Sequence, residues 1–288
     1  ILILYFLLNM TKVAVLIPSH IYYKGQIFLL DKCINSIIKQ TIQPNIYISI
    51  SFDNESYKKE FTKKILLKYG EIVTFKFSKV KLYQMEHLYN ISSKIHNKYD
   101  MFMFCDDDDT YDILRVEKFI EYFEQGKKYQ EFGRYGGVRE YFKSNNPELE
   151  IPEYWAYGIV PSVIIDFFKF FKDINYILLK HKFGDMYFRH YLRKNKKYLH
   201  WCGILEEKDG NVYPRLYNYN INNPNSICGR IEKGTGDIKD NIILEILKCN
   251  NDNKLNNILS EYTVILSGYL PNLFKYIYEF CKKIYKDI

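Results

Sequence analysis

Apolar runs and amphipathic segments alternate along the first half of the chain. The apolar runs are short and rich in β-branched and aromatic residues, as is typical of strands buried on both faces. The segments between them carry apolar residues at helical spacing. This alternation predicts a mostly parallel sheet flanked by helices, with the first strand ended by Pro18. The expected strands are 12–17, 46–52, 72–77 and 101–105, and the expected helices are 28–39, 57–69, 82–95 and 113–123.

The second half of the chain is less regular. Its expected strands are 136–142, 155–160, 198–205 and 211–219, and its expected helices are 162–171 and 184–194. Residues 220–240 are rich in Asn and Gly, which predicts a loop, and 264–284 carry one apolar face, which predicts a helix kinked at Pro271. We therefore expect one α/β domain over 10–219, followed by a loop and C-terminal helical extension over 220–288.

Residues 1–9 are interpreted as lying outside the domain. Ile1 to Leu8 are apolar throughout, and the first methionine is Met10. Eight residues cannot cross a bilayer, which takes roughly 20, and no cationic region precedes them as in a signal peptide. Two alternatives stay open: the stub of a truncated anchor, or translated sequence ahead of a start at Met10. Membrane association through the termini also stays open.

Composition places the chain among globular proteins and says little about its partner. Hydrophobic residues make up 47% of the sequence and charged residues 26%. The net charge of +7 suits an anionic ligand, but a lysine-coated surface explains it equally well, and no nucleic-acid partner is predicted. The six cysteines form no C-x-x-C pair, so a zinc site is not expected. We expect reduced thiols and a cytoplasmic location.

Four consecutive acids, Asp106 to Asp109, follow the apolar strand 101–105 directly. Ligands of open α/β sheets bind at the carboxyl ends of the strands. Four carboxylates at such an edge repel one another unless a cation lies between them, and carboxylate oxygens suit Mg²⁺ or Mn²⁺. Asp106 and Asp108 lie two positions apart and share a face if the chain is still extended. The alternative is an acidic turn that caps the following helix.

The order of motifs resembles family 2-type glycosyltransferases of the GT-A fold. From Val13 to Ser56 the chain reads strand, P-S-H, a helix ending S-I-I-K-Q-T, and a strand ending D-N-E-S. The D-D-D-D block resembles the D-x-D metal site of that family, and the resemblance covers roughly 12–194. It implies a GT-A-type catalytic domain that moves a sugar from a nucleoside-diphosphate donor, UDP-linked by default, to a hydroxyl acceptor. Asn54 departs from the pattern, because a second Asp is common there.

The resemblance also implies roles for individual residues. Pro18 and Ser19 line the nucleoside pocket, Asp53 accepts a hydrogen bond from the base or ribose, and His87 faces the donor. In the acidic block Asp108 is the principal ligand of Mn²⁺ or Mg²⁺. Asp106 contacts the metal or the ribose, and Asp107 contacts the nucleotide. The acceptor, on a glycan, lipid or protein, is not indicated.

An inverting transfer needs a carboxylate that takes the proton of the attacking hydroxyl. Asp185 begins the expected helix 184–194 and matches the position of the base in the family, although Gly184 stands where an acidic residue is commoner. The alternative is an N-cap aspartate. Aromatic residues in 154–160 are candidates for acceptor contact or for the core. Further candidates are a closing loop at 228–236, with Arg230 or Lys233 on the diphosphate, and His200 as a metal ligand.

Two other functions fit parts of the sequence. Asp106, Asp108 and Thr110 match the first motif of haloacid-dehalogenase-type Mg²⁺-dependent phosphatases, with Asp106 as nucleophile. That motif usually opens its fold, however, whereas three strand–helix units precede it here. Arg189 also stands where the last acidic motif of that class needs Asp. The other alternative is a non-catalytic nucleotide- or sugar-binding module, which has no use for a base at Asp185.

Overall fold

The computed structural model describes residues 11–128, 135–140, 153–174, 179–180, 184–194, 198, 200–204, 207–208, 211–212 and 216–220. In these parts of the chain seven strands form one sheet in the order β3-β2-β1-β4-β7-β6-β8. All neighbours are parallel except β7, which is antiparallel to both β4 and β6. The strands are β1 Val13–Ile21, β2 Asn45–Phe52, β3 Val73–Phe77, β4 Met101–Phe104, β6 Tyr135–Glu140, β7 Tyr157–Ile159 and β8 His200–Ile204.

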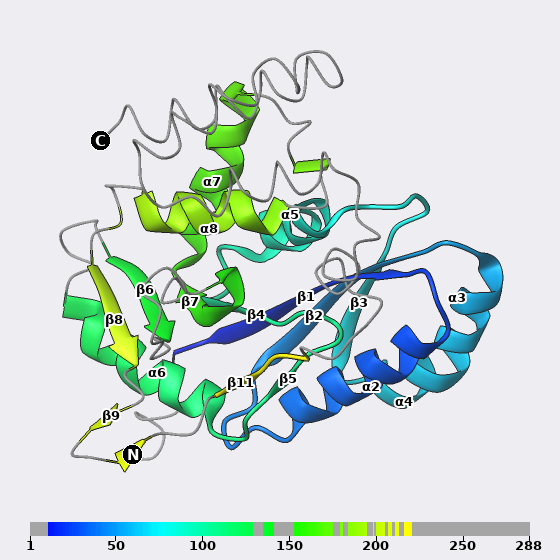
Figure 1. Cartoon of the computed structure of the whole chain (residues 1–288), viewed down its shortest axis with the longest axis horizontal. Helices are drawn as coiled ribbons and strands as arrows, with labels where there is room; N and C mark the ends of the chain where they lie inside the picture. Colours follow the sequence, from blue (N-terminus) through cyan, green and yellow to red (C-terminus); the bar gives the residue numbers. More distant parts are fainter. Residues whose placement is uncertain are drawn as a thin grey trace, which may run out of the picture.

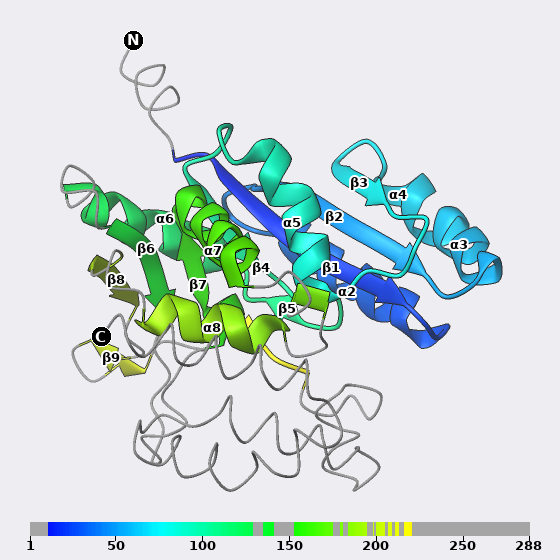
Figure 2. The ribbon, with the colours of Figure 1, turned by 90° about the horizontal axis from the view of Figure 1, so that it is seen from above.

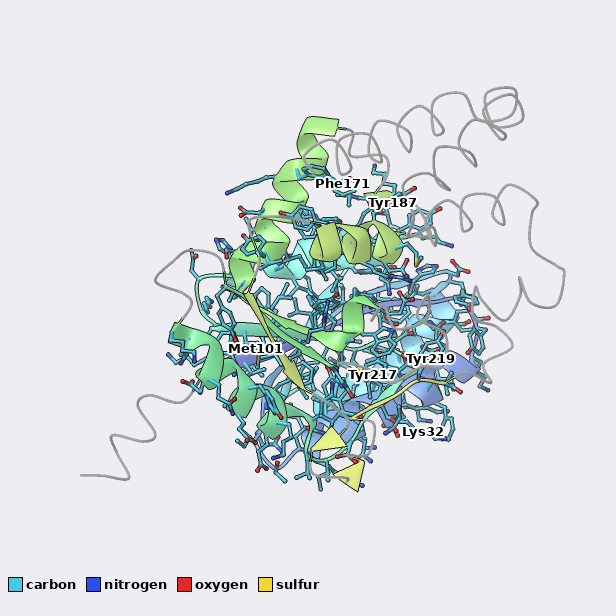
Figure 3. The ribbon with its side chains drawn as sticks, turned by 60° about the vertical axis from the view of Figure 1, so that its left-hand side comes forward. Lys32, Met101, Phe171, Tyr187, Tyr217 and Tyr219 are labelled. Carbon is cyan, nitrogen blue, oxygen red and sulfur yellow. The ribbon has the colours of Figure 1, made fainter. Side chains whose placement is uncertain are left out.

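Helices cover both faces of the sheet, so the predicted mostly parallel sheet flanked by helices is confirmed (Figure 1). One face carries α2, the α3–α4 segment and α6, and the other carries α5, α7 and α8, which lie over the strands in Figure 2. Phe171 of α7 and Tyr187 of α8 lie between these two helices (Figure 3). The helices are α2 Gly25–Ile38, α3 Glu55–Phe61, α4 Leu67–Tyr69, α5 Gln84–Ile95, α6 Arg115–Gly126, α7 Pro161–Ile174 and α8 Gly184–Lys194.

The first strand is longer than predicted, because Pro18 lies inside β1 and does not end it. β4 pairs with β1 only from Val13 to Leu16, and the Leu16 carbonyl accepts from the backbone N–H of Cys105 on that side. Residues two apart in a strand face the same neighbour, so Pro18 points to the side on which β4 has already ended. The missing N–H of proline therefore costs no ladder hydrogen bond there.

The other elements of the first half were predicted to within a few residues, and the second half needs corrections. In the expected strand 155–160, residues Tyr154–Ala156 form a 3₁₀ turn, η4, and only β7 is extended. The expected helix 57–69 contains a π-helical turn, η1, at Thr62–Leu66. Within the expected strand 211–219, the described residues include two short strands, β10 and β11. β10 Asn211–Val212 pairs with β9 Glu207–Lys208, and β11 Tyr217–Asn218 pairs with β5 Thr110–Tyr111.

Residues 1–9 and, apart from Asn220, the predicted extension 220–288 lie outside the described residues, as do Arg230 and Lys233. In the part of the chain that is described, no helix is long and apolar enough to cross a membrane.

Gln40 joins the end of α2 to the chain that leaves the acidic block. Its Nε2 donates to the carbonyl oxygens of Ser36 at 3.1 Å and Asp112 at 2.7 Å, and its Oε1 accepts from Val116 N at 2.9 Å. The next residue, Thr41, donates its backbone N–H to the carbonyl of Ile113 at 3.1 Å. The S-I-I-K-Q-T segment therefore holds the loop that follows Asp109 and positions the acids.

Candidate active site

The predicted donor-site residues gather at one edge of the sheet. β2 runs parallel to β1, and β1 runs parallel to β4, so their carboxyl ends point the same way. Asp53 follows β2 directly, and Asp106 to Asp109 follow β4. Pro18 and Ser19 lie near the end of β1, where both are buried.

The carboxylate of Asp106 is held on one oxygen. Oδ1 accepts from Gln84 Nε2 of α5 at 2.7 Å and from the hydroxyl of Tyr154 of η4. Gln84 Nε2 also donates to the Tyr154 hydroxyl at 2.8 Å. The backbone N–H of Asp106 donates to the Tyr217 hydroxyl at 3.1 Å. The local sequence gives no sign of these contacts, since the partners lie 22 to 111 positions away.

Asp107 and Asp109 are bound to other parts of the protein. Asp107 Oδ2 accepts from Ser19 Oγ at 2.5 Å and from Gln26 Nε2 at 2.9 Å. Asp109 is buried, and its two oxygens accept from the Tyr217 hydroxyl and from Asn220 N, each at 2.7 Å. These two acids fix the shape of the loop. Asp106, whose Oδ2 takes part in no hydrogen bond among the described residues, and the half-buried Asp108 are the better candidates for binding a ligand at the rim of the loop.

Burial raises the pKa of Asp106, Asp107 and Asp109, and the neighbouring charge of Asp108 raises the pKa of each further. The acids therefore repel one another in the protein alone, and a divalent cation would relieve that repulsion. Mg²⁺ is commonly bound by one or two carboxylates together with substrate phosphates. Asp106 and Asp108 fit that arrangement. The described residues contain no cluster of three or more His, Cys, Asp or Glu side chains that could hold a metal without such a substrate.

Asp185 lies in the first turn of α8, inside the helix and not before it, so an N-cap role does not describe it well. Its Oδ1 is buried and has no hydrogen-bond partner in the described part of the chain. The pKa of Asp185 is raised to about 8, chiefly by burial and then by the charges of Glu153 and Asp106, while Arg189 opposes the rise. Arg189 Nη1 lies 2.6 Å from Glu153 Oε1, so this ion pair joins α8 to the residue before η4.

Tyr154 links the two predicted catalytic features. Burial raises its pKa well above the usual range, and the charges of Asp106 and Asp185 raise it further. Asp185 from α8 and Asp106 from β4 therefore act on one phenol. The structure thus brings the predicted base and the acidic block into one site, although 79 positions separate them in the sequence (185 − 106).

His87 requires a correction, because it is buried and has no face toward a ligand. Its ring nitrogens contact Ser49 Oγ at 2.8 Å and Ser51 Oγ at 3.1 Å. His20, the last residue of P-S-H, lies at the site instead, with Nε2 2.8 Å from Asp53 Oδ1. The sequence places His20 directly after Pro18 and Ser19, which are predicted site residues. A single histidine in a strand, however, does not indicate which side chain it will contact.

An aromatic stack lies beneath the acidic loop. Trp155 is buried and packs on Tyr217, with ring centroids 4.1 Å apart and planes 8° apart, while Tyr219 lies on its rim (Figure 3). Trp155 therefore belongs to the core and is not available for acceptor contact. Arg115 pairs with Glu140 and donates to the Trp155 carbonyl at 2.8 Å, and Glu140 accepts from Leu216 N at 2.9 Å. The strand of His200 is described, but the side chain is not.

Fold and site together define an α/β protein with a carboxylate-rich site at the carboxyl edge of its parallel strands. No protein-family model matches the chain, and no curated protein sequence matches it. Solved structures of S. aureus TarS do match, and this chain spans less than half of the longer TarS chain. The first gives a TM-score of 0.49 at 14% identity, over 90% of this chain and 44% of that chain.

TarS 1-349 in complex with UDP-GlcNAc gives a TM-score of 0.49 at 11% identity, over 90% of this chain and 73% of that chain. GalNAc-T7 with UDP, GalNAc and Mn²⁺ gives 0.33 at 16% identity, over 39% of this chain and 21% of that chain. With TM-scores below 0.5, these similarities carry no conclusion about the function of this chain.

Proposed function

We propose that this chain is a metal-dependent, inverting glycosyltransferase of the GT-A type, which moves a sugar from a UDP-sugar to a hydroxyl group of a glycan, lipid or protein. The observation that carries the proposal is the buried, unpartnered carboxylate oxygen of Asp185, in the same site as Asp106. A binding module has no need of a carboxylate oxygen that is desolvated and left without a partner. Such a group does suit a general base.

In this proposal the diphosphate and the nucleoside of the donor are bound by different residues. Asp106 and Asp108 hold Mn²⁺ or Mg²⁺, which when bound would neutralise the charge of the diphosphate. Asp53, exposed at the end of β2, accepts a hydrogen bond from the nucleoside. Pro18 and Ser19 form the buried floor beside it, and Asp107 positions that floor through its hydrogen bond with Ser19.

The reaction is a single displacement. Asp185 accepts the proton of the acceptor hydroxyl while that oxygen forms a bond to the anomeric carbon of the sugar. The bond between this carbon and the diphosphate oxygen breaks, and its electron pair leaves with the diphosphate. Because the oxygen enters opposite the leaving group, the anomeric configuration inverts. A base of this kind contributes about 10²- to 10⁴-fold to the rate.

Two measurements test the proposal. UDP should bind in calorimetric titration more tightly with Mn²⁺ than without it, and Asp108→Ala should remove the metal dependence while the protein stays folded. Asp31→Ala on α2 is the control. Asp185→Asn should keep UDP affinity and melting temperature but lose turnover with a panel of nucleotide sugars. Binding of UDP that does not depend on metal, near-normal turnover in Asp185→Asn, or retention of configuration would each refute it.

No contact in the described part of the chain favours the phosphatase alternative. Its nucleophile would be Asp106, whose Oδ1 is already occupied by two donors, Gln84 and Tyr154. Release of inorganic phosphate from a phosphomonoester, lost in Asp106→Asn, would favour that function instead.

A further inference from the structure

A row of hydrogen-bonded side chains runs from Asp53 into the interior of the protein. Asp53 Oδ1 lies 2.8 Å from His20 Nε2, and His20 Nδ1 lies 2.8 Å from Ser51 Oγ. Ser51 Oγ lies 3.1 Å from His87 Nε2, and His87 Nδ1 lies 2.8 Å from Ser49 Oγ. The row joins β1, β2 and α5, and its inner three members are buried while Asp53 is partly exposed.

The Asp53 carboxylate, at the exposed end of the row, determines which atom carries the proton in each hydrogen bond. An ionised carboxylate only accepts, so His20 must donate to Asp53 from Nε2. A neutral imidazole that donates from Nε2 accepts at Nδ1, so the Ser51 hydroxyl donates to His20. Ser51 has then used its proton, and His87 must donate to it from Nε2. His87 therefore accepts at Nδ1 from the Ser49 hydroxyl.

Both rings have to be neutral for this arrangement to hold, and their surroundings favour that form. Burial lowers the pKa of His20; the nearby charge of Lys81 also lowers it, while Asp53 raises it. Burial lowers the pKa of His87 to about 3, with a smaller contribution from His20. At neutral pH the row therefore has one arrangement of protons, and every hydrogen bond in it is satisfied.

The connectivity Ser51–His20–Asp53 matches that of a nucleophilic Ser–His–Asp triad, but the geometry excludes that role. A nucleophile has to reach its substrate, and Ser51 is fully buried in β2. Its hydroxyl contacts the rings of His20 and His87. The backbone nitrogen of Leu82 also lies 3.5 Å from Ser51 Oγ. The row therefore orients a group at its exposed end and does not attack a substrate.

We propose that His20 is a positioning residue for the Asp53 carboxylate, and that Ser51, His87 and Ser49 hold the ring of His20 in the orientation that lets Nε2 donate to that carboxylate. The inference rests on the proposed function, in which Asp53 faces the nucleoside of the donor. His20 holds Oδ1, and Oδ2 takes part in no hydrogen bond within the described part of the chain. An acceptor-only oxygen in a fixed place selects an N–H or O–H donor. The imide N–H of uracil is such a group, and the corresponding ring nitrogen of cytosine is not.

Histidine ring ¹⁵N spectra of the full chain test the tautomers without any ligand. At pH 7 His20 and His87 should both carry their proton on Nε2, with assignments from His20→Gln and His87→Gln. His87 should keep this neutral form down to about pH 4, because its pKa is about 3. A proton on Nδ1 of His20 at pH 7 would overturn the proposal.

The Ser51→Ala variant tests the link from the row to the ligand. It should leave Nδ1 of His20 without its donor, which changes the ¹⁵N shift of Nδ1, lets the ring rotate and weakens UDP binding about 3- to 10-fold, the loss expected for one hydrogen bond. The preference for UDP over CDP should fall with it. The matched control is Ser92→Ala on α5, where the hydroxyl is equally buried and has no hydrogen-bond partner among the described residues. We expect Ser92→Ala to change neither quantity.

The outcomes also separate this inference from the proposed function. If the wild-type chain shows the Nε2 tautomers but binds no UDP, the proposed function fails, and His20 has no nucleoside to position. If UDP binds with metal dependence but Ser51→Ala changes neither the Nδ1 shift of His20 nor the UDP-to-CDP preference, the proposed function stands and the positioning role is refuted.

Discussion

The carboxyl group of Asp185 lies near two acids, Glu153 and Asp106, and one base, Arg189. A general base has to be ionised before it can accept a proton, so kcat/KM should follow the ionised fraction of this group. With a pKa of about 8, kcat/KM should rise about tenfold per pH unit below pH 8 and level off above it. The measurement is a pH profile of kcat/KM with a donor and acceptor that turn over.

The ion pair beside Asp185 provides variants that should move this profile in opposite directions. Glu153→Gln removes a negative charge that raises the pKa of Asp185, so the rise should move to lower pH. Arg189→Met removes the opposing positive charge, so it should move to higher pH. A purely structural defect would lower the rate without moving the profile. Equal shifts in both variants, or none, would exclude Asp185 as the titrating base.

Residues in short motifs could be predicted from the sequence, and their partners could not. Asp106 to Asp109 and Asp185 stand out because an apolar strand or an amphipathic helix frames them. Gln84 and Tyr154 approach Asp106 only through the packing of α5 and η4 on the sheet. Nothing in their local sequence separates them from the other 27 tyrosines of the chain and its other glutamines.

At the scale of elements, the contact of α2 with the loop after the acidic block depends on Gln40. Gln40→Leu would leave Val116 N and the Asp112 carbonyl without their partner, at a cost of about 1–3 kcal/mol. We expect a lower free energy of unfolding in a denaturant titration, together with weaker Mn²⁺-dependent UDP binding. Lys39→Leu, at the exposed residue before Gln40, should stay within about 0.5 kcal/mol of the wild type. Equal effects of the two substitutions would contradict this role.

The contact of α6 with β6 depends on the buried pair Arg115 and Glu140. Arg115→Met would leave the Glu140 carboxylate buried without its counter-charge, and it should lower the free energy of unfolding by about 3–5 kcal/mol. Adding Glu140→Gln should recover part of that loss, because glutamine has no charge and still accepts from Leu216 N. The exposed pair of Lys127 with Glu124 is the control, and Lys127→Met should cost about 0–1 kcal/mol.

Across the whole molecule, the part of the fold that could be predicted is the part in which apolar strands alternate with amphipathic helices along the chain. Strand and helix periods predicted the elements from β1 to α6 apart from the two-residue strand β5, because buried positions recur in them at regular spacing. The course of β1 past Pro18 depends on where its neighbour β4 ends, which no local period records. The segment 216–220 is likewise held by Glu140 and Asp109, contacts 76 to 111 positions away, so its place under the acidic loop could not be predicted.

The buried carboxyl groups of the site should make the free energy of unfolding depend on pH and on bound metal. The pKa of Asp106, Asp107, Asp109 and Asp185 is raised in the folded protein, so folding favours their protonated forms. Their contribution to stability is complete below the pKa of the unfolded carboxyl, about 4, and is lost as pH rises through 7 to 8. The melting temperature of the metal-free protein should therefore fall between pH 5.5 and pH 8.5, over the range scanned by differential calorimetry.

Mn²⁺ should reverse this trend, because it binds ionised carboxylates. At a concentration about 100 times its Kd it should stabilise the folded protein by about 2.7 kcal/mol, and the rise in melting temperature should be larger at pH 8.5 than at pH 5.5. Asp108→Ala should remove the metal effect and also raise the melting temperature of the metal-free protein at pH 8.5, since one repelling charge is gone. A metal effect that is greater at acid pH, or that survives Asp108→Ala, would place the cation elsewhere.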